Sequence, residues 1–370
     1  MPSVQKTRVS LELPILAPSG AHHRADRPPL APPPAPEHAH QCGRLLDSHG
    51  RTIRHLRISI TDRCNFRCVY CMDPDVRFMP RDELLSVDEI ARLARLAAAF
   101  GITRSGITGG EPTVHPDLTS IIAAVAQTGV HVAMTTNGSR MDPESLSAWK
   151  AAGLARLTIS IDAAEPETFA RITRSKTTPD DLIRGIHAAR AAGLWPVKLN
   201  SVILRGVNDC QIVPLAALAR DLGVAMRYIE FMPLDSGHHW ERSRVVTAAE
   251  MLGAINAAYP LIADGREEKS ATALRYRFAD GAPGGIGMIA PVSQPFCGAC
   301  SRLRITADGK VRPCLFSATE WDLRPLLRNG GDDEALRRFL VDATWTKQAG
   351  HGIGRAGFEP PERTMSAIGG

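Results

Sequence analysis

Two groups of three cysteines are the residues with the clearest capacity for chemistry. Cys64, Cys68 and Cys71 follow a C-x3-C-x2-C pattern, and Cys297, Cys300 and Cys314 follow C-x2-C-x13-C. Disulfide frameworks are typical of small secreted chains, whereas this chain has 370 residues and holds six of its eight cysteines in these groups. The spacing therefore predicts metal ligands rather than disulfides.

The first group can provide three thiolates from one loop. Three thiolates can bind three corners of a 4Fe-4S cluster and leave the fourth iron without a protein ligand. S-adenosylmethionine (SAM) could chelate that iron through its amino and carboxylate groups, and a reduced cluster could then cleave SAM to a 5′-deoxyadenosyl radical. Structural zinc needs four ligands, usually as two pairs, so three cysteines with Tyr70 directly before the third fit zinc poorly.

The second group offers the same number of thiolates, and its open iron could hold a substrate directly. Zinc stays open as an alternative here, because C-x2-C is also a common zinc knuckle. Cys210 could complete such a site, but it lies in Asn208-Asp209-Cys210 at an expected helix start, and we interpret it as incidental.

Alternating strands and helices must position these groups. Six apolar or β-branched runs predict strands, at 57–60, 102–108, 130–135, 156–161, 196–203 and 225–231. Five amphipathic stretches predict helices, at 86–100, 117–128, 143–152, 178–192 and 211–222. This order predicts an α/β protein with a parallel sheet. Six units are fewer than the eight of a closed TIM barrel, so we expect a partial (βα)6 TIM-like barrel, although periodicity alone also allows a doubly wound sheet.

The sequence divides into three regions. Residues 1–42 are rich in Pro, Ala and His and predict a disordered extension. Residues 43–240 would form the barrel. Residues 241–370 would form a C-terminal cap that carries the second cluster and ends in Gly369-Gly370.

Bulk composition narrows the functional class. The chain is 44% hydrophobic and 22% charged, as in ordinary globular proteins, with a formal net charge of +5. This mild excess suits a small polyanion such as a nucleoside triphosphate, and no block of like charges points to nucleic acid. No apolar run approaches the ~18 residues that a membrane helix needs, so we expect no membrane association and a cytoplasmic location.

The cysteine pattern and a glycine turn together resemble a known superfamily. Gly109-Gly110-Glu111-Pro112 follows the second expected strand, and with C-x3-C-x2-C after the first it resembles the radical SAM superfamily. The second cysteine group, followed by Arg302-x-Arg304, resembles the GTP 3′,8-cyclase family over about residues 44–370.

That resemblance implies a fold and an activity. The fold would be a barrel of the radical SAM type with two 4Fe-4S clusters and bound SAM. The enzyme would be a lyase that converts GTP to 3′,8-cyclo-7,8-dihydro-GTP, the first step of molybdenum cofactor biosynthesis. The product would pass to a downstream cyclic pyranopterin monophosphate synthase, and the enzyme would be a homodimer. The electron donor is not indicated.

The resemblance also assigns residues to the two small molecules, while no catalytic side chain is assigned, because the radical chemistry belongs to the clusters. The residues implied for SAM are Tyr70, Gly110, Ser160 and Met232. Those implied for GTP are Arg57, Thr135, Lys198, Arg302, Leu303 and Arg304. The family usually has an arginine where this chain has Gly106, and Arg104 lies two residues earlier on the same face of a regular strand.

Two other functions remain open from the sequence. A radical SAM peptide-modifying enzyme with an auxiliary cluster would act on a peptide and ignore GTP. A zinc-stabilised nucleic-acid-binding protein would contain zinc and bind DNA or RNA in a salt-sensitive way.

Overall fold

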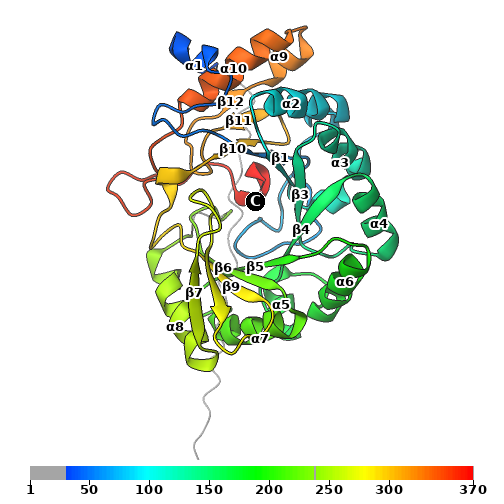
Figure 1. The fold of residues 1–370 in the computed structure, drawn as a ribbon, viewed down its shortest axis with the longest axis vertical. Coiled ribbons are helices and arrows are strands. Elements are labelled where there is room, and N and C mark those ends of the chain that lie inside the picture. The colour runs from blue at the N-terminus through cyan, green and yellow to red at the C-terminus, as the bar shows by residue number, and fades with distance from the viewer. Residues whose placement is uncertain (1–30, 237–238, 370) are drawn as a thin grey trace, which may run out of the picture.

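A computed structural model describes residues 31–236 and 239–369. Six strands, β1 to β6, lie side by side in sequence order, and each is parallel to the next. Their bounds are His55–Ser59, Arg104–Thr108, His131–Thr136, Leu154–Ser160, Lys198–Ile203 and Ala225–Glu230. This order confirms the partial (βα)6 barrel (Figure 1).

Helices cover the outside of this sheet (Figure 1). They are α2 (Val87–Ala99), α3 (Leu118–Ala126), α4 (Pro143–Ala151), α5 (Pro166–Thr173), α6 (Pro179–Ala191) and α7 (Ile212–Leu222). Helix α2 begins with a capping box, in which Ser86 accepts a hydrogen bond from the Glu89 backbone and Glu89 accepts one from the Ser86 backbone. Short 3-10 turns lie at Arg81–Glu83, Pro112–Val114, Asp209–Gln211, Arg242–Arg244 and Cys297–Ala299.

The C-terminal region continues the barrel sheet at both of its edges. Strand β9 (Gly285–Ile289) runs parallel to β6, and β10 (Arg302–Ile305) runs parallel to β1. Antiparallel partners extend each edge: β8 (Leu274–Phe278) and β7 (Leu261–Gly265) on one side, β11 (Lys310–Arg312) and β12 (Trp321–Asp322) on the other. The helices of this region are α8 (Ala248–Ala258), α9 (Arg324–Arg328), α10 (Asp333–Trp345) and α11 (Met365–Ile368). Strand pairing therefore crosses the predicted boundary at 240/241.

The disordered extension predicted for residues 1–42 is wrong for its last part, while residues 1–30 lie outside the described residues. Helix α1 (Glu37–Gln41) packs on α10, as Figure 1 shows. Ala39 is fully buried, His38 meets Trp345 edge to face, and the Ala35 amide donates to Asp342 at 2.7 Å. The composition of the segment did not reveal that a few of its side chains have partners on a distant helix.

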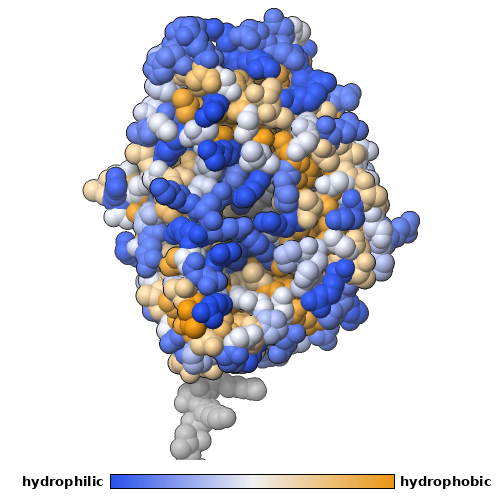
Figure 2. All heavy atoms as spheres, viewed as in Figure 1, coloured by the Kyte–Doolittle hydropathy of each residue, from blue (hydrophilic) through white to orange (hydrophobic). Residues whose placement is uncertain are grey.

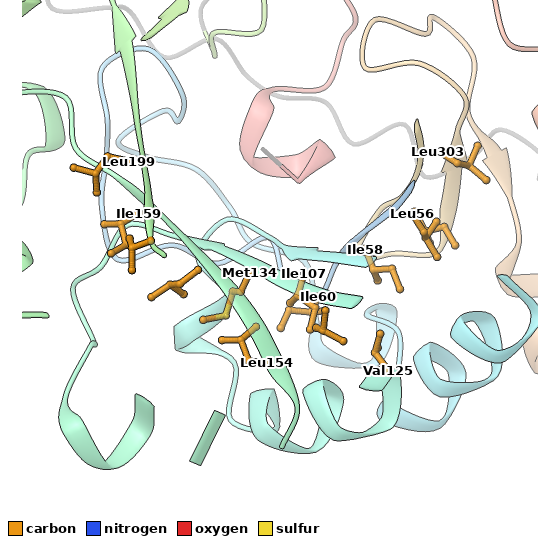
Figure 3. Close-up of a cluster of buried hydrophobic side chains, with 14 of the residues drawn as sticks. Leu56, Ile58, Ile60, Ile107, Val125, Met134, Leu154, Ile159, Leu199 and Leu303 are labelled. Carbon is orange, nitrogen blue, oxygen red and sulfur yellow. The ribbon is translucent and has the colours of Figure 1, made fainter. Parts of the chain in front are cut away.

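Alternation along the strands separates an outer core from the barrel interior. Leu56, Ile58, Ile107, Met134 and Leu199 are buried in one continuous hydrophobic cluster beneath the helices (Figure 3). Because successive side chains of a strand point to opposite faces, the residues between them face the barrel interior. In register, Arg57 lies beside Gly106 on one neighbour and beside Arg304 on the other.

Helix α11, the red helix beside the C mark in Figure 1, lies near the middle of the ring of helices. The Arg304 guanidinium donates to the Gly369 carbonyl. Gly369 has φ +87°, and a Cβ there would lie 2.7 Å from the Ser59 Cβ, so only glycine fits. Gly370 lies outside the described residues. No helix in the described ranges is long and apolar enough to cross a membrane.

Candidate active site

One cavity of about 450 Å³ lies at the carboxyl ends of the barrel strands, and all six cysteines of the two groups line it. The structure brings the predicted ligand contacts to the same cavity, namely Arg57, Tyr70, Gly110, Thr135, Ser160, Lys198, Met232, Arg302 and Arg304. Figure 2 shows hydrophilic residues gathered around the middle of the viewed face. Two cysteine groups separated by more than two hundred residues in sequence therefore share one reaction space.

The first cysteine group lies on the loop that leaves β1. The Phe66 amide donates to the Cys64 sulfur at 3.4 Å, and the Asn137 side chain approaches the same sulfur at 3.8 Å. Burial raises the pKa of the Cys64 thiol to about 11 and that of Cys71 to about 12. Protons on these thiols must therefore be displaced by a strong Lewis acid before the group can act as a thiolate set.

A carboxylate and a phenol lie beside this group. The Tyr70 hydroxyl donates to Asp162 at 2.6 Å, and the Val202 amide donates to the other carboxylate oxygen at 2.8 Å. Burial raises the pKa of Asp162 to about 6, although these hydrogen bonds oppose the shift. The sequence did not single out Asp162, because an Asp after a strand end is a common turn residue.

The glycine turn after β2 is fastened to the chain's own backbone. The Gly110 amide donates to the Thr61 carbonyl at 2.7 Å, and a Cβ on Gly110 would lie 2.4 Å from the Asp62 carbonyl oxygen. Glu111 is buried and accepts hydrogen bonds from the Thr136 hydroxyl and the Asn137 amide, both at 2.6 Å. The turn thus locks the ends of β1, β2 and β3 together beside the first cysteine group.

The second cysteine group has basic surroundings. Cys297 and Cys300 lie on a 3-10 turn before β10, and Cys314 follows β11. The Arg302 guanidinium donates to the Cys300 sulfur at 3.3 Å. Burial alone would raise the pKa of the Cys300 thiol, but Arg302 and Lys347 outweigh it and lower that pKa to about 7.

Both groups fit an iron–sulfur cluster by the chemistry of their donors. Each offers three cysteine thiols with a nitrogen donor directed at one sulfur, the arrangement that stabilises bound thiolates. Among residues 31–236 and 239–369, no three His, Cys, Asp or Glu side chains are close enough to hold a single metal ion. A cube bound at its corners holds its ligands farther apart than one ion does. Cys210 is exposed and does not line the cavity.

A band of basic side chains crosses the barrel interior between the strands. Arg57 and Lys198 were predicted, and Arg156 on β4 and Arg227 on β6 join them. Burial and neighbouring arginines lower the pKa of Arg57 and of Arg227 to about 10. The buried Arg227 Nε has no hydrogen-bond partner. Such a concentration of positive charge is suited to a polyanionic ligand.

A second cavity of about 460 Å³ opens at the opposite ends of the strands. Arg57, Arg156, Lys198 and Arg227 line both cavities, so the basic band lies between them. Two glutamates of the β7–β8 loop face this mouth: Glu268 lies 2.8 Å from Arg104, and Glu267 lies 3.7 Å from Lys198.

Comparisons with known proteins agree with this geometry. Residues 58–219 match the radical SAM superfamily, and residues 224–353 match Molybdenum Cofactor Synthesis C. A GTP 3′,8-cyclase of Mycobacterium sp. (strain KMS) is 46% identical over 89% of this chain and 94% of that protein. The Streptomyces coelicolor GTP 3′,8-cyclase is 42% identical over 88% and 96%. The chain belongs to the GTP 3′,8-cyclase family.

Solved structures of other radical SAM enzymes share the fold. Streptococcus suis SuiB bound to its precursor peptide SuiA aligns with a TM-score of 0.61 at 13% identity, over 83% of this chain and 68% of that one. The SAM-bound anSMEcpe aligns with a TM-score of 0.54 at 14% identity, over 81% and 82%. At these identities the likeness concerns the fold alone.

Gly106 occupies the position at which the resemblance predicted an arginine. A Cβ at Gly106 would lie 3.6 Å from the Arg57 Cγ, so Arg57 covers the position. Arg104 does not line the cavity that holds the cysteines, and it pairs with Glu268 at the opposite mouth. Arg57, rather than Arg104, therefore fills the space beside Gly106.

Leu303 was also predicted to bind GTP, and its side chain does not line the cavity. Leu303 is 1% exposed and packs in the outer core near Leu56 (Figure 3). Alternation along β10 explains this, because Arg302 and Arg304 face the cavity and the residue between them cannot. The same alternation would have found Arg156 and Arg227, which interrupt otherwise apolar strands as Arg57 and Lys198 do.

Proposed function

We propose that this protein cyclises GTP to 3′,8-cyclo-7,8-dihydro-GTP by radical SAM chemistry, the first step of molybdenum cofactor biosynthesis. The observation that carries the proposal is the single cavity, in which two three-cysteine groups and a basic band face one another. Family membership supports the reaction, and the cavity supplies a place for each reactant.

SAM belongs at the first cysteine group in this proposal. Tyr70, Gly110, Ser160 and Met232 surround that part of the cavity. When bound, a first cluster reduced by an external electron donor would cleave SAM to methionine and a 5′-deoxyadenosyl radical, which would supply the capacity to remove the hydrogen at C3′ of GTP. The chain's own contribution is to hold the reactants in order, since the Glu111 hydrogen bonds fix the strand ends on which they rest.

GTP belongs between the basic band and the second cysteine group. Arg57, Lys198 and Arg227 can bind triphosphate oxygens, because guanidinium and ammonium groups donate charge-assisted hydrogen bonds. Thr135, Arg302 and Arg304 line the same cavity. With the triphosphate held by the basic band, Thr135 would lie along the nucleoside, and the two arginines would lie beside the guanine end. Leu303 would contribute only its backbone, and the ribose would lie between SAM and the second cluster.

The finer parts of the proposal concern partners and location. The enzyme would act as a homodimer in the cytoplasm, where a reducing environment keeps its cysteines available for clusters. Its product would pass to a cyclic pyranopterin monophosphate synthase.

Anaerobic reconstitution tests the function. The full chain, loaded with iron and sulfide, is incubated with SAM, dithionite and GTP deuterated at C3′. We expect GTP-dependent formation of 5′-deoxyadenosine that carries deuterium, together with a product that is isomeric with GTP by mass spectrometry. Cys210→Ala serves as a control because this thiol is exposed and away from the cavity.

Two results would overturn the proposal. One is a protein with both clusters that forms no GTP-dependent 5′-deoxyadenosine. The other is 5′-deoxyadenosine whose deuterium content does not depend on labelled GTP, as a peptide-modifying enzyme would give.

A further inference from the structure

A buried lysine lies behind the second cysteine group. Lys347 follows α10 and is 3% exposed. Its ammonium donates to the Arg302 carbonyl at 2.9 Å and to the Pro313 carbonyl. Arg302 is two residues after Cys300, and Pro313 directly precedes Cys314. One side chain thus joins the two separate segments that provide the thiols.

The charge of Lys347 has no carboxylate partner. Within the described ranges Lys347 forms no ion pair with Asp or Glu, whereas the buried Arg312 pairs with Glu320 and Arg363 pairs with Asp308. Removing an ammonium from water costs several kcal/mol unless an opposite charge compensates. Lys347 lines the cavity that holds the cysteines, and its ammonium contacts the chain close to Cys300 and directly before Cys314. The thiolates are the negative charge available to it.

We propose that Lys347 is a positioning residue of the second cluster that also raises its reduction potential. The two carbonyl contacts fix the spacing between the Cys297–Cys300 turn and Cys314. The unpaired positive charge favours the reduced state, which carries one more electron, because net charge around a cluster helps to set its potential. The first cysteine group differs, because its basic neighbour Arg67 lies there together with the acidic Asp162 and Glu111.

This inference rests on the proposed function, in which Cys297, Cys300 and Cys314 bind a cluster. The test distinguishes failure of that function from failure of the role assigned to Lys347. The full chain carrying Cys64→Ala, Cys68→Ala and Cys71→Ala holds only the second cluster. Its midpoint potential is measured by anaerobic redox titration with electron paramagnetic resonance, alongside iron and sulfide content.

Three substitutions at Lys347 separate charge from hydrogen bonding. K347Q keeps two N–H donors without the charge, K347M removes both, and K347R keeps both. We expect K347Q and K347M to lower the potential by an amount equal to about a tenfold change in the reduction equilibrium, about 59 mV for one electron. K347R should stay near the parent value. Lys150→Met, on the outer helix α4, controls for loss of a distant charge.

The outcomes decide between the explanations. An intact cluster in K347Q with an unchanged potential overturns the inference. Loss of the cluster from K347Q and K347M but not from K347R supports the need for charge. Equal loss of the cluster from K347Q, K347M and K347R overturns the inference, because a positive charge at this position would then not be enough to retain the cluster. If the parent protein binds no iron at the second group, the proposed function fails instead.

Discussion

The two cysteine groups share a cavity but differ in their electrostatic surroundings. The first is buried among Asp162, Glu111 and Tyr70, with Arg67 as a basic neighbour of Cys64, and burial raises the pKa values of its thiols. The second lies beside Arg302 and Lys347, which lower the pKa of Cys300 to about 7 against the effect of burial. Three thiols therefore lie in mainly acidic surroundings at one end of the cavity, and three lie in basic surroundings at the other end.

The difference matches the charges of the two proposed ligands. SAM carries a sulfonium and an ammonium, so an acidic neighbourhood favours it. GTP is a polyanion, so it belongs on the side where the second group merges with the basic band. The cavity is thus polarised along its length, and this polarity orients the reactants before any chemistry takes place.

Two single variants, each lacking one thiol at one end of the cavity, should give the largest effect on activity. Cys68→Ala should abolish 5′-deoxyadenosine formation, because the cluster that reduces SAM is lost. Cys300→Ala should abolish the GTP product but retain slow, GTP-independent cleavage of SAM. Iron content should fall by about half in each variant, and chromatography measures both products.

Cys210→Ala provides the matched control for both thiol variants, since its side chain is exposed. If Cys68→Ala and Cys300→Ala lose SAM cleavage equally, the two ends are not functionally separate and the comparison is wrong.

The basic band supplies the next largest effect. Arg227→Met should weaken GTP binding about ten- to hundredfold, since a hydrogen bond to a charged group contributes about 1.5–3 kcal/mol. SAM affinity should change little, because Arg227 lies on β6 within the band and not at the first group. Equilibrium binding of GTP, GDP and guanosine to the reconstituted protein measures this.

For Arg227 the control is Arg338→Met, which removes an exposed arginine from α10. The assignment of the band to phosphate fails if Arg227→Met weakens guanosine as much as GTP.

Local sequence patterns were sufficient for the order of strands and helices in the barrel, whereas the family resemblance supplied most of the predicted site residues. The amphipathic stretch at 86–100 predicted α2, and the apolar residues on either side of Arg57 and Lys198 predicted strands around these two basic residues. Both signals arise from neighbours within a few residues, where the backbone period alone decides which way a side chain points.

Long-range pairing could not be predicted in the same way. Strand β10 pairs with β1 although about 245 residues separate them, and nothing in either short run specifies the other. Lys347 follows an ordinary amphipathic helix, so its sequence context resembles that of a surface lysine. The role that we propose for Lys347 depends on two carbonyl groups that only the tertiary fold brings next to its ammonium.

A smaller effect is expected from the acidic end. Asp162→Asn should weaken SAM binding about fivefold at neutral pH, because it removes ~1 kcal/mol of attraction for a cation. The pKa of Asp162 is raised to about 6, so the carboxylate is neutral below that pH and charged above it. Wild type and variant should therefore converge as the pH falls below about 6. Binding of SAM across this pH range measures the effect.

Tyr70→Phe separates charge from hydrogen bonding, because it removes the 2.6 Å contact while leaving the carboxylate. Because the Tyr70 hydrogen bond lowers the pKa of Asp162, we expect Y70F to retain the increase in SAM affinity but to shift it to higher pH. If SAM affinity still increases with pH in Asp162→Asn, a group other than Asp162 is responsible for the pH dependence.

The smallest effect concerns the glutamates at the opposite mouth. Glu267 lies 3.7 Å from Lys198 and competes with phosphate for that ammonium. Because exposed ion pairs contribute about 0–1 kcal/mol, Glu267→Gln should tighten GTP binding by about two- to threefold. The gain should shrink as salt screens the pair, and Glu144→Gln on α4 is the control. Weaker binding of GTP by Glu267→Gln would contradict this expectation. It would mean that Glu267 holds Lys198 in the position that binds phosphate instead of competing for it. The polarity of the cavity would then depend on an acidic residue at its basic end.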